Sequence, residues 1–477
     1  MRRWLAFVCV AACGPTAHAP ATKTAADTHP HKAKVAALVQ PLIDAEYASG
    51  MVIGLYDAGR IEVYGFGKGP GGVPPDESTL FEIGSVTKVF TSLLLADAVE
   101  KQEVRLETNV ADLLPPGVTV PTRDTHTITL GMLATHTSGL PRMPPSLAGR
   151  EDAPDPYAKY GEEALYEDLI RTPLLDTPGN KVVYSNFGAG VLGFVLGRKL
   201  GHGFAVELDG RVLEPLGLGS TYLSVPEGAK FRRATGTNSD LVPVPYWYFD
   251  ALAGAGALVS DAHDMLALID EELDAAAGSH EPLRQAMHFT QQPQLDHPQG
   301  DNEGLGWQID TAGRFWHNGQ TGGFHSYVGF DTKTRRGVVI LASTGLAIFD
   351  RIADQMYQML AGENVQPPVV PTPEQLAPYA GTYSLQGEKL VISLKGKRMY
   401  ITGRGTPPFR MIPLDEHEMW IEQLQAIVRF QRSGLRVARA VFFVGDQEMA
   451  AKRIDDDAAG SASGSATGSG SGSGSGS

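Results

Sequence analysis

Strand-like segments lie at both ends of residues 33–362, whereas the chain between them is rich in helices and loops. Near the N-terminal end, the apolar runs 51–56 and 60–66 are separated by Asp57-Ala58-Gly59, a pattern that predicts a β-hairpin. Short strand-like runs return at residues 307–309, 314–317, 325–330 and 337–342. We therefore expect an α/β (α+β) fold. Its mainly antiparallel sheet would be built from both ends of the chain, flanked by helices, with a helical subdomain.

Helical spacing of apolar residues predicts several of the helices around this sheet. Val35, Leu38, Val39 and Leu42 indicate a first helix. The apolar run 191–200 predicts another helix, and residues 348–360 predict the helix that closes the domain.

Composition divides the rest of the chain. Pro367, Pro368, Pro371 and Pro373 mark a linker at residues 363–378. Alternating runs at 389–394, 398–401, 426–430 and 437–443 predict a small, lipocalin-like β-barrel over residues 379–457. Residues 458–477 are almost pure Gly and Ser and are expected to be disordered.

The N-terminus has the features of an export signal. Arg2 and Arg3 precede a short apolar run at residues 4–12, well below the about 20 residues of a membrane span. The end of the run, Val10-Ala11-Ala12-Cys13-Gly14, resembles a bacterial lipoprotein signal, which implies lipidation of Cys13 and removal of the residues before it. A plain secretory signal is the alternative. Both predict export to the cell envelope or periplasm, with residues 1–13 as signal and 14–32 as a flexible tether. Only a lipid anchor would then hold the protein at a membrane.

Charge and cysteine content exclude several classes of function. The formal net charge is −14 and no dense basic patch occurs, so no nucleic-acid partner is expected. Cys9 and Cys13 are the only cysteines, which excludes a cysteine nucleophile, a structural disulfide and a cysteine-ligated zinc site in the folded body. Neither His-Glu-x-x-His nor Gly-x-Ser-x-Gly occurs, and no metal or organic cofactor is expected.

Ser85-Val86-Thr87-Lys88 is the only Ser-x-x-Lys sequence in the chain, and it opens a predicted buried amphipathic helix. Lys88 lies three residues after Ser85, over the same helix face. A serine hydroxyl becomes a good nucleophile when a neighbouring base takes its proton, and a buried, neutral lysine amine can be that base. Taken alone, a helix N-cap serine followed by a surface lysine explains the same residues.

Two further segments contain residues suited to acyl transfer. Tyr184-x-Asn186 offers a phenol that can carry a proton near a cationic lysine, and an amide that can bind a substrate amide. His317-Asn318-Gly319-Gln320 lies between strand-like runs, so His317 is expected at the edge of a strand. Gly319 permits close approach of the backbone to a ligand. A turn with a core tyrosine and a glycine-rich hairpin are the alternatives.

The order Ser-x-x-Lys, Tyr-x-Asn, His-x-Gly resembles the β-lactamase-like serine hydrolases: class C β-lactamases, penicillin-binding carboxypeptidases, esterases and D-aminopeptidases. Residues 133–141, which include His-Thr-Ser-Gly-Leu-Pro, and residues 254–260 with Asp264 beyond them are similar to further motifs of this group. The resemblance covers about residues 33–362.

The resemblance implies roles for these residues. Ser85 would be the acylated nucleophile, Lys88 its base, and Tyr184 a proton relay. Asn186, His317 and Gly319 would contact the substrate. The backbone N–H groups of Ser85 and Gln320 would stabilise the oxyanion. His136 is expected to be structural. Residues 246–249 are expected either to line an apolar cleft or to pack in the core.

His317 departs from the lysine found there in many relatives. A histidine is mostly neutral near neutral pH, which weakens recognition of a substrate carboxylate. The sequence therefore predicts an exported serine hydrolase that acts on small-molecule or peptide substrates, as a D-aminopeptidase-like or esterase-like enzyme on peptides, amides or esters. A β-lactamase or D,D-carboxypeptidase is the alternative, and a non-catalytic envelope binding protein is the second alternative.

Overall fold

A computed structural model describes residues 29–150, 153–294, 302–445 and 447–454. The signal, Cys13 and the Gly/Ser tail lie outside these residues. Within the described ranges, no helix is both long and apolar enough to cross a membrane.

The central sheet has seven antiparallel strands in the order β2-β1-β9-β8-β7-β6-β5. Its N-terminal hairpin pairs with a strand almost 300 residues later in sequence, because Met51 of β1 lies opposite Ala342 of β9. The expected sheet built from both chain ends is therefore confirmed. The strands are β1 (Gly50–Asp57), β2 (Arg60–Gly67), β5 (Asn302–Glu303), β6 (Gln308–Ile309), β7 (Phe315–Gln320), β8 (His325–Asp331) and β9 (Arg336–Ala342).

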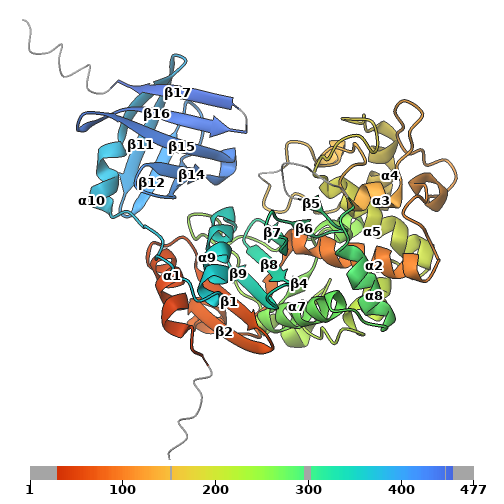
Figure 1. Ribbon diagram of the computed structural model, residues 1–477. Coiled ribbons are helices and arrows are strands. Elements are labelled where there is room, and N and C mark those ends of the chain that lie inside the picture. Colours follow the sequence, from red (N-terminus) through yellow and green to blue (C-terminus); the bar gives the residue numbers. More distant parts are fainter. Residues whose placement is uncertain (1–28, 151–152, 295–301, 446, 455–477) are drawn as a thin grey trace, which may run out of the picture.

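Helices cover both faces of this sheet (Figure 1). Side chains alternate along a strand. Thus Met51 and Ile53 of β1 join the core under α1 (Lys32–Asp44) and α9 (Arg351–Leu360), while Val52 joins the larger core on the α7 (Ala262–Ala276) side. The remaining helices of this domain are α2 (Thr87–Glu100), α3 (Leu130–Ala134), α4 (Glu162–Arg171), α5 (Asn186–Leu200), α6 (Phe204–Leu208) and α8 (Pro282–Thr290).

The helix that follows Ser85 is buried, as predicted, but it is not amphipathic. In α2 every residue from Thr87 to Ala98 is buried, the polar residues included. The helix lies in the middle of the domain and contacts α5 and α8, so these residues have no solvent-facing side. Its polar residues are satisfied internally, as when Thr91 Oγ1 donates to Gly254 O at 2.9 Å.

The C-terminal strands form a closed barrel in the order β10-β11-β12-β13-β14-β15-β16-β17, as the all-β pattern predicts. Large side chains, including Tyr383, Met399, Met411 and Phe430, fill its interior. The short helix α10 (Pro373–Leu376) precedes it, with a capping box between Thr372 and Gln375. The strands are β10 (Gly381–Leu385), β11 (Glu388–Lys395), β12 (Arg398–Thr402), β13 (Phe409–Pro413), β14 (Glu418–Ile421), β15 (Ala426–Ser433), β16 (Arg436–Val444) and β17 (Gln447–Arg453).

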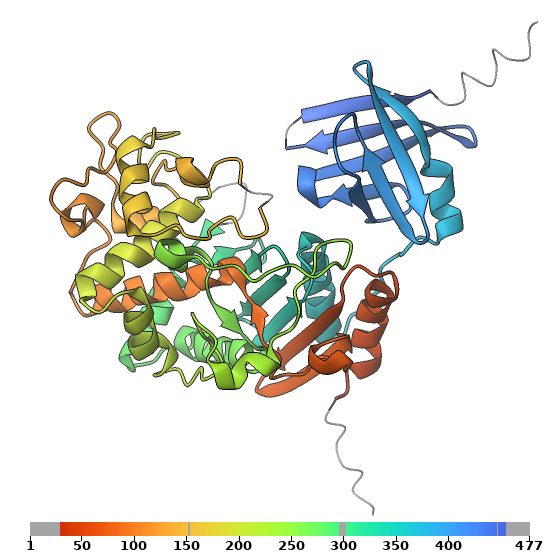
Figure 2. The same cartoon turned by 180° about the vertical axis from the view of Figure 1, so that it is seen from behind.

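The barrel packs against the sheet domain rather than hanging free. Ile412 of the barrel belongs to the apolar core that α1 and α9 form on the sheet, and the partly buried Trp420 packs against this core. Figure 2 shows the barrel from behind, beyond the α1 end of the domain and far from the helical subdomain.

Candidate active site

Ser85 lies in a short 3-10 helix (Gly84–Val86) that leads directly into α2. Gly84 before it has a φ of 48°, a left-handed conformation that glycine adopts without strain. A Cβ at Gly84 would lie 2.7 Å from Gln320 N, so the absence of a side chain lets β7 approach the serine. The serine does not cap the helix with its side chain, in contrast to the N-cap alternative.

Lys88 is buried under the serine, with 2% of its surface exposed. Its Nζ lies 2.9 Å from Ser85 Oγ, 2.9 Å from Asn186 Oδ1 and 2.7 Å from Ala255 O. Burial, and then the positive charge of Arg142, hold the Lys88 pKa well below its usual value of 10.5. The surface lysine of the alternative interpretation is therefore excluded.

Lys88 Nζ donates to all three of these partners. Asn186 Oδ1 and Ala255 O only accept hydrogen bonds, whereas the Ser85 hydroxyl can also donate. When the amine is uncharged, its two N–H groups can stay on Asn186 and Ala255 while its lone pair accepts from Ser85 Oγ. The arrangement can move a proton from Ser85 Oγ to Lys88 Nζ.

Tyr184 lies over the same amine, immediately before α5. Its ring centroid is 5.0 Å from Lys88 Nζ. Desolvation raises the Tyr184 pKa, while a hydrogen bond with the Ser85 side chain and the charge of Arg142 act to lower it. The phenol therefore contacts both the hydroxyl and the amine that the Ser-x-x-Lys motif supplies.

Helix α5 begins five residues earlier than the predicted run, at Asn186, because Ser185 caps it: Ser185 Oγ accepts from Gly188 N at 2.8 Å. This cap fixes Tyr184 and Asn186 on either side of a buried serine. Asn186 Oδ1 accepts from Lys88, and its Nδ2 donates to the Tyr157 hydroxyl at 3.0 Å.

His136 supports the Tyr184 segment, as expected of a structural residue. Its ring centroid lies 4.4 Å from that of Tyr184, and its Nδ1 accepts from Ser185 N at 3.2 Å. Burial holds its pKa well below the usual value of 6.5, so the ring is a neutral acceptor.

His317 lies inside β7, opposite Val328, rather than at the edge of a strand. The strand extends three residues beyond the predicted run because it pairs with β8 along its whole length. The ring is 3% exposed, and burial lowers the His317 pKa to about 4. The strand therefore presents a neutral imidazole.

Gly319 and His317 have side-chain directions on the same face of β7, because they are two residues apart. A Cβ at Gly319 would lie 2.0 Å from Ile83 O and 2.8 Å from Ser85 N, so this face points at the nucleophile. Any side chain at position 319 would displace the serine loop. The structure thus brings Ser85, Lys88, Tyr184 and Asn186 into contact and places His317, Gly319 and Gln320 on the strand beside them.

Two residues at this site had no signal of their own in the sequence. Tyr157 holds Asn186, and Arg142 lies with its Cζ 5.2 Å from the Tyr184 ring centroid. Arg142 directly follows the Leu-Pro of the 133–141 segment, which is the one hint the sequence contained. Its side chain is exposed, so it is a cation at the mouth of the site.

The aromatic run 246–249 divides between the two expected roles. Phe249 stacks on Tyr157 at 4.2 Å between ring centroids, and Tyr246 stacks on Phe324. Trp247, Tyr248 and Phe249 also line a cavity of about 920 Å³ that includes neither Ser85 nor Lys88.

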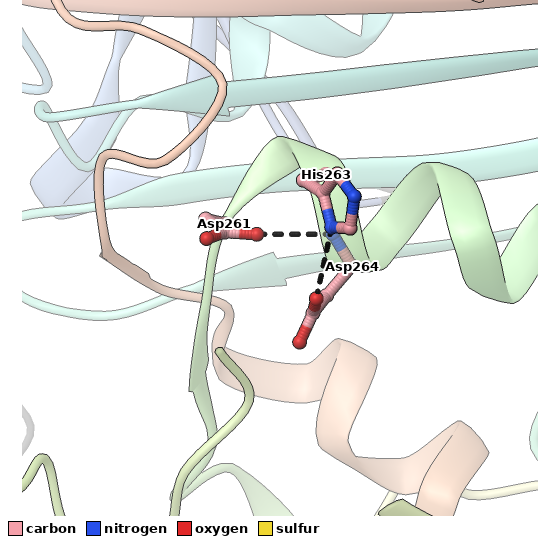
Figure 3. A group of neighbouring side chains, drawn as sticks. All are labelled: Asp261, His263 and Asp264. Atoms are coloured by element: carbon pink, nitrogen blue, oxygen red, sulfur yellow. Dashed lines mark hydrogen bonds and ion pairs between the residues drawn. The ribbon is translucent and has the colours of Figure 1, made fainter. Parts of the chain in front are cut away.

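Asp261, His263 and Asp264 are the one cluster with metal-ligand geometry in the described ranges (Figure 3). Their carboxylates already have partners. Asp261 caps α7 through Asp264 N and pairs with Arg232 at 2.6 Å, and Asp264 accepts from Thr221 Oγ1 at 2.8 Å. The cluster therefore anchors α7, and no metal is assigned to it.

Comparison with known proteins matches the sheet domain. The family model described as Beta-lactamase covers residues 35–363, ending before α10 and the barrel. Penicillin-binding protein 4 of Amycolatopsis lactamdurans is 28% identical over 342 residues, which cover 66% of this chain and 87% of the relative. D-alanyl-D-alanine-carboxypeptidase/endopeptidase AmpH of Escherichia coli (strain K12) is 25% identical over 346 residues, covering 68% and 87%. A solved class C beta lactamase has the same fold, with a TM-score of 0.61 at 22% identity over 70% of this chain and 99% of that one.

Proposed function

The chain belongs to the beta-lactamase family of serine hydrolases, and on that premise we propose that it hydrolyses a small peptide, amide or ester through an acyl-enzyme on Ser85. The observation that carries this proposal is the buried Lys88 amine, 2.9 Å from Ser85 Oγ, whose hydrogen bonds within the described chain go to no carboxylate. A neutral amine at hydrogen-bond distance is what a serine needs as a base.

In the proposed reaction Ser85 Oγ attacks the acyl carbon while its proton passes to Lys88 Nζ. The backbone N–H groups of Ser85 and Gln320 stabilise the oxyanion. Collapse of the tetrahedral intermediate breaks the bond to the leaving group, which takes a proton from Tyr184. Water then attacks the ester and Tyr184 accepts its proton. Lys88 returns its proton to Ser85 Oγ as the acyl–oxygen bond breaks, which releases the acid and restores both residues. Asn186 orients the substrate amide.

The neutral His317 supports a D-aminopeptidase-like or esterase-like activity. A lysine at this position would be a fixed cation for a substrate carboxylate, and an imidazole with a pKa of about 4 is not. Esters, amides and peptides without a carboxylate at that position suit such a site.

A β-lactamase or D,D-carboxypeptidase activity is the second candidate. It is favoured by the named activities of the relatives and by Arg142, whose exposed guanidinium is a cation beside Tyr184. A non-catalytic binding role is the third candidate, and the intact Ser85–Lys88 pair disfavours it.

Intact-protein mass spectrometry distinguishes these candidates. The protein is incubated with a fluorophosphonate, nitrocefin, p-nitrophenyl acetate and D-alanine p-nitroanilide, with Ser85→Ala as control. We expect an adduct on Ser85 and turnover of the ester or the anilide. Efficient nitrocefin turnover would select the second candidate, and no adduct with any probe would select the third.

Lys88→Ala tests the base. Because the general base is worth on the order of 10²-fold or more, acylation of Ser85 should fall by at least that factor. The measurement is the rate of fluorophosphonate labelling. Near-normal labelling in this variant would show that another group takes the proton.

We also propose that the protein is exported and lipid-anchored at Cys13. The proposal rests on the signal-like residues 1–13. The mass of the mature N-terminus tests it, because lipidation would leave an acylated Cys13 as the first residue.

A further inference from the structure

The barrel is joined to the sheet domain by one buried arginine and one partly buried arginine. Arg410 of β13 is 2% exposed, and its guanidinium donates to Glu46 O at 2.9 Å and to Ser239 O. Arg398 of β12 donates to the Glu46 carboxylate at 2.8 Å and to Asp240 O at 2.8 Å. These contacts join two strands of the barrel to the end of α1 and to one loop, so they define how the barrel is oriented.

A second contact reaches the active site. The chain leaves β14 into a short 3-10 helix (Glu422–Leu424), and Glu422 Oε1 accepts from Gln320 Nε2 at 2.6 Å. Gln320 is the last residue of β7 and lies 102 positions away in sequence. In Figure 1, β14 is on the side of the barrel that faces α9 and β7.

The Glu422 carboxylate is held in place from both of its oxygens. Trp420 Nε1 donates to Oε2 at 2.6 Å, and Gln425 Nε2 donates to Oε1 at 3.0 Å. Trp420 is itself packed into the core that the barrel shares with α1 and α9. Gln320 therefore meets a carboxyl oxygen whose orientation is fixed by two other donors.

Gln320 connects this carboxylate to the nucleophile because its backbone and its side chain point in opposite directions. Its backbone nitrogen lies 2.7 Å from the place of a Cβ on Gly84, next to Ser85. Its side chain leaves β7 on the face opposite to His317 and Gly319, toward the barrel. Gln320 Nε2 also donates a second hydrogen bond to Gly345 O at 3.3 Å, which further restrains the side chain.

We propose that the barrel contributes to the active site. Glu422 of the barrel holds the Gln320 side chain and thereby sets the position of the β7 backbone N–H that stabilises the oxyanion. The inference rests on the proposed function, since it requires acylation of Ser85. Glu422 and the Gln320 side chain are positioning residues; neither touches the reacting atoms.

The effect of losing this contact should fall on turnover rather than on binding. Removing one oxyanion donor from a serine hydrolase costs about 10²–10³ in kcat. Glu422→Ala loosens the donor without removing it, so we expect kcat to fall by roughly 5- to 50-fold, with KM within about twofold of wild type. Glu422→Gln keeps an oxygen for Gln320 Nε2 and should retain most of the activity.

The experiment measures kcat and KM for p-nitrophenyl acetate and the rate of fluorophosphonate labelling of Ser85. It compares wild type, Glu422→Ala, Glu422→Gln, Gln320→Ala and the double variant. Glu418→Ala is the matched control, because Glu418 begins β14, the strand that leads to Glu422, and pairs with Arg429 of the barrel. Thermal unfolding of each variant is recorded alongside.

Non-additive losses in the double variant, with a normal Glu418→Ala, would support the inference, since coupled residues lose their shared contact only once. Wild-type kcat in Glu422→Ala, or additive losses that follow the drop in stability, would overturn it. A wild-type protein that labels at Ser85 keeps the proposed function in either case. A wild-type protein that gives no adduct removes both.

Discussion

In the proposed reaction Lys88 can be the base only when its amine is uncharged, and Arg142 is an exposed residue whose charge lowers the Lys88 pKa. Its guanidinium lowers the pKa of Lys88 and of Tyr184, because a second positive charge makes the ammonium ion less favourable and the phenolate more favourable. Arg142 is exposed and can be replaced without opening the core.

Arg142→Leu should therefore move the acid limb of the pH profile of kcat/KM to higher pH. Without the neighbouring charge the Lys88 pKa rises, so a smaller fraction of the amine is neutral at a given pH. On that limb we expect a fall of roughly 3- to 10-fold, larger at low ionic strength. Arg171→Leu, which removes an exposed cation paired with Glu167, is the control. An acid limb that stays in place would show that Arg142 does not influence the base.

Among individual residues, the sequence identified those that belong to chemically distinctive motifs. It missed residues that reach the site only through the folding of a loop. Ser85, Lys88, Tyr184 and Asn186 were predicted as a group because their motifs have a recognisable order, and the structure brings their side chains together. Tyr157 had no motif. It contacts Asn186 only because the loop that precedes α4 folds back over the start of α5.

Strand β7 is expected to tolerate substitution poorly, because it touches the serine loop directly. Gly319 is the point where this strand touches the serine loop, with Ile83 O only 2.0 Å from the place of a Cβ. An alanine there must push apart two backbones that are each held by neighbouring strands and helices.

Gly319→Ala should reduce labelling of Ser85 by at least about 10²-fold, because a displacement on the order of 1 Å is enough to cost that much in catalysis. The same overpacking should destabilise the fold by roughly 1–3 kcal/mol. Gly228→Ala is the control, since a Cβ at Gly228 meets nothing within 4 Å in the described chain. Normal labelling in Gly319→Ala would mean that β7 and the serine loop can separate freely.

Helix α7 carries a different constraint, a fully buried carboxyl group. Burial raises the pKa of Glu272 to about 8, an effect only partly offset by a hydrogen bond from Gln291 at 2.6 Å. The folded state thus binds a proton that the unfolded chain, with a carboxyl pKa near 4.5, has released. The contribution of Glu272 to stability is present below pH 4.5 and is lost as the pH rises toward 8.

Glu272→Gln should accordingly raise the free energy of unfolding at pH 8 by roughly 2–5 kcal/mol and leave it almost unchanged at pH 4.5. The amide keeps an oxygen that can accept from Gln291. Urea unfolding at the two pH values measures the effect, with the partly exposed neighbour Glu271→Gln as control. An equal gain at both pH values would contradict a proton-linked cause.

Element prediction worked for strands that are bounded by local turns, and it missed that the polar face of α2 is buried as well. The β1–β2 hairpin and the runs of β8 and β9 were predicted within one or two residues, since their patterns and turns are local. Helix α2 was predicted to be amphipathic, yet its polar Thr87, Lys88 and Thr91 are as buried as its leucines. A hydrophobic pattern cannot show that polar residues are buried with internal partners.

At the scale of the whole molecule, the sequence indicated two globular units and a proline-rich linker but not how they meet. The contact between Arg410 and the Ser239 carbonyl joins residues 171 positions apart, and nothing local to either segment marks it. A small barrel behind a proline-rich linker has the sequence pattern of an appendage. In the structure, however, contacts at a buried interface hold the barrel against the sheet domain. These contacts fix the orientation of the barrel and therefore the position of Glu422.

Arg410→Met tests whether the barrel and the sheet domain behave as one cooperative unit. The substitution keeps an apolar stem but leaves the carbonyls of Glu46 and Ser239 without their donor, and each buried unsatisfied group costs about 1–3 kcal/mol. That cost falls on the interface, because the Arg410 guanidinium donates to carbonyl groups of the sheet domain. We expect calorimetry to show one transition for wild type and two for Arg410→Met, with the barrel melting separately and kcat falling as Gln320 loses Glu422.

Arg439→Met, on the exposed face of β16, should keep a single transition. A single, unshifted transition in Arg410→Met would mean that the barrel is held mainly by the apolar contacts of Ile412 and Trp420.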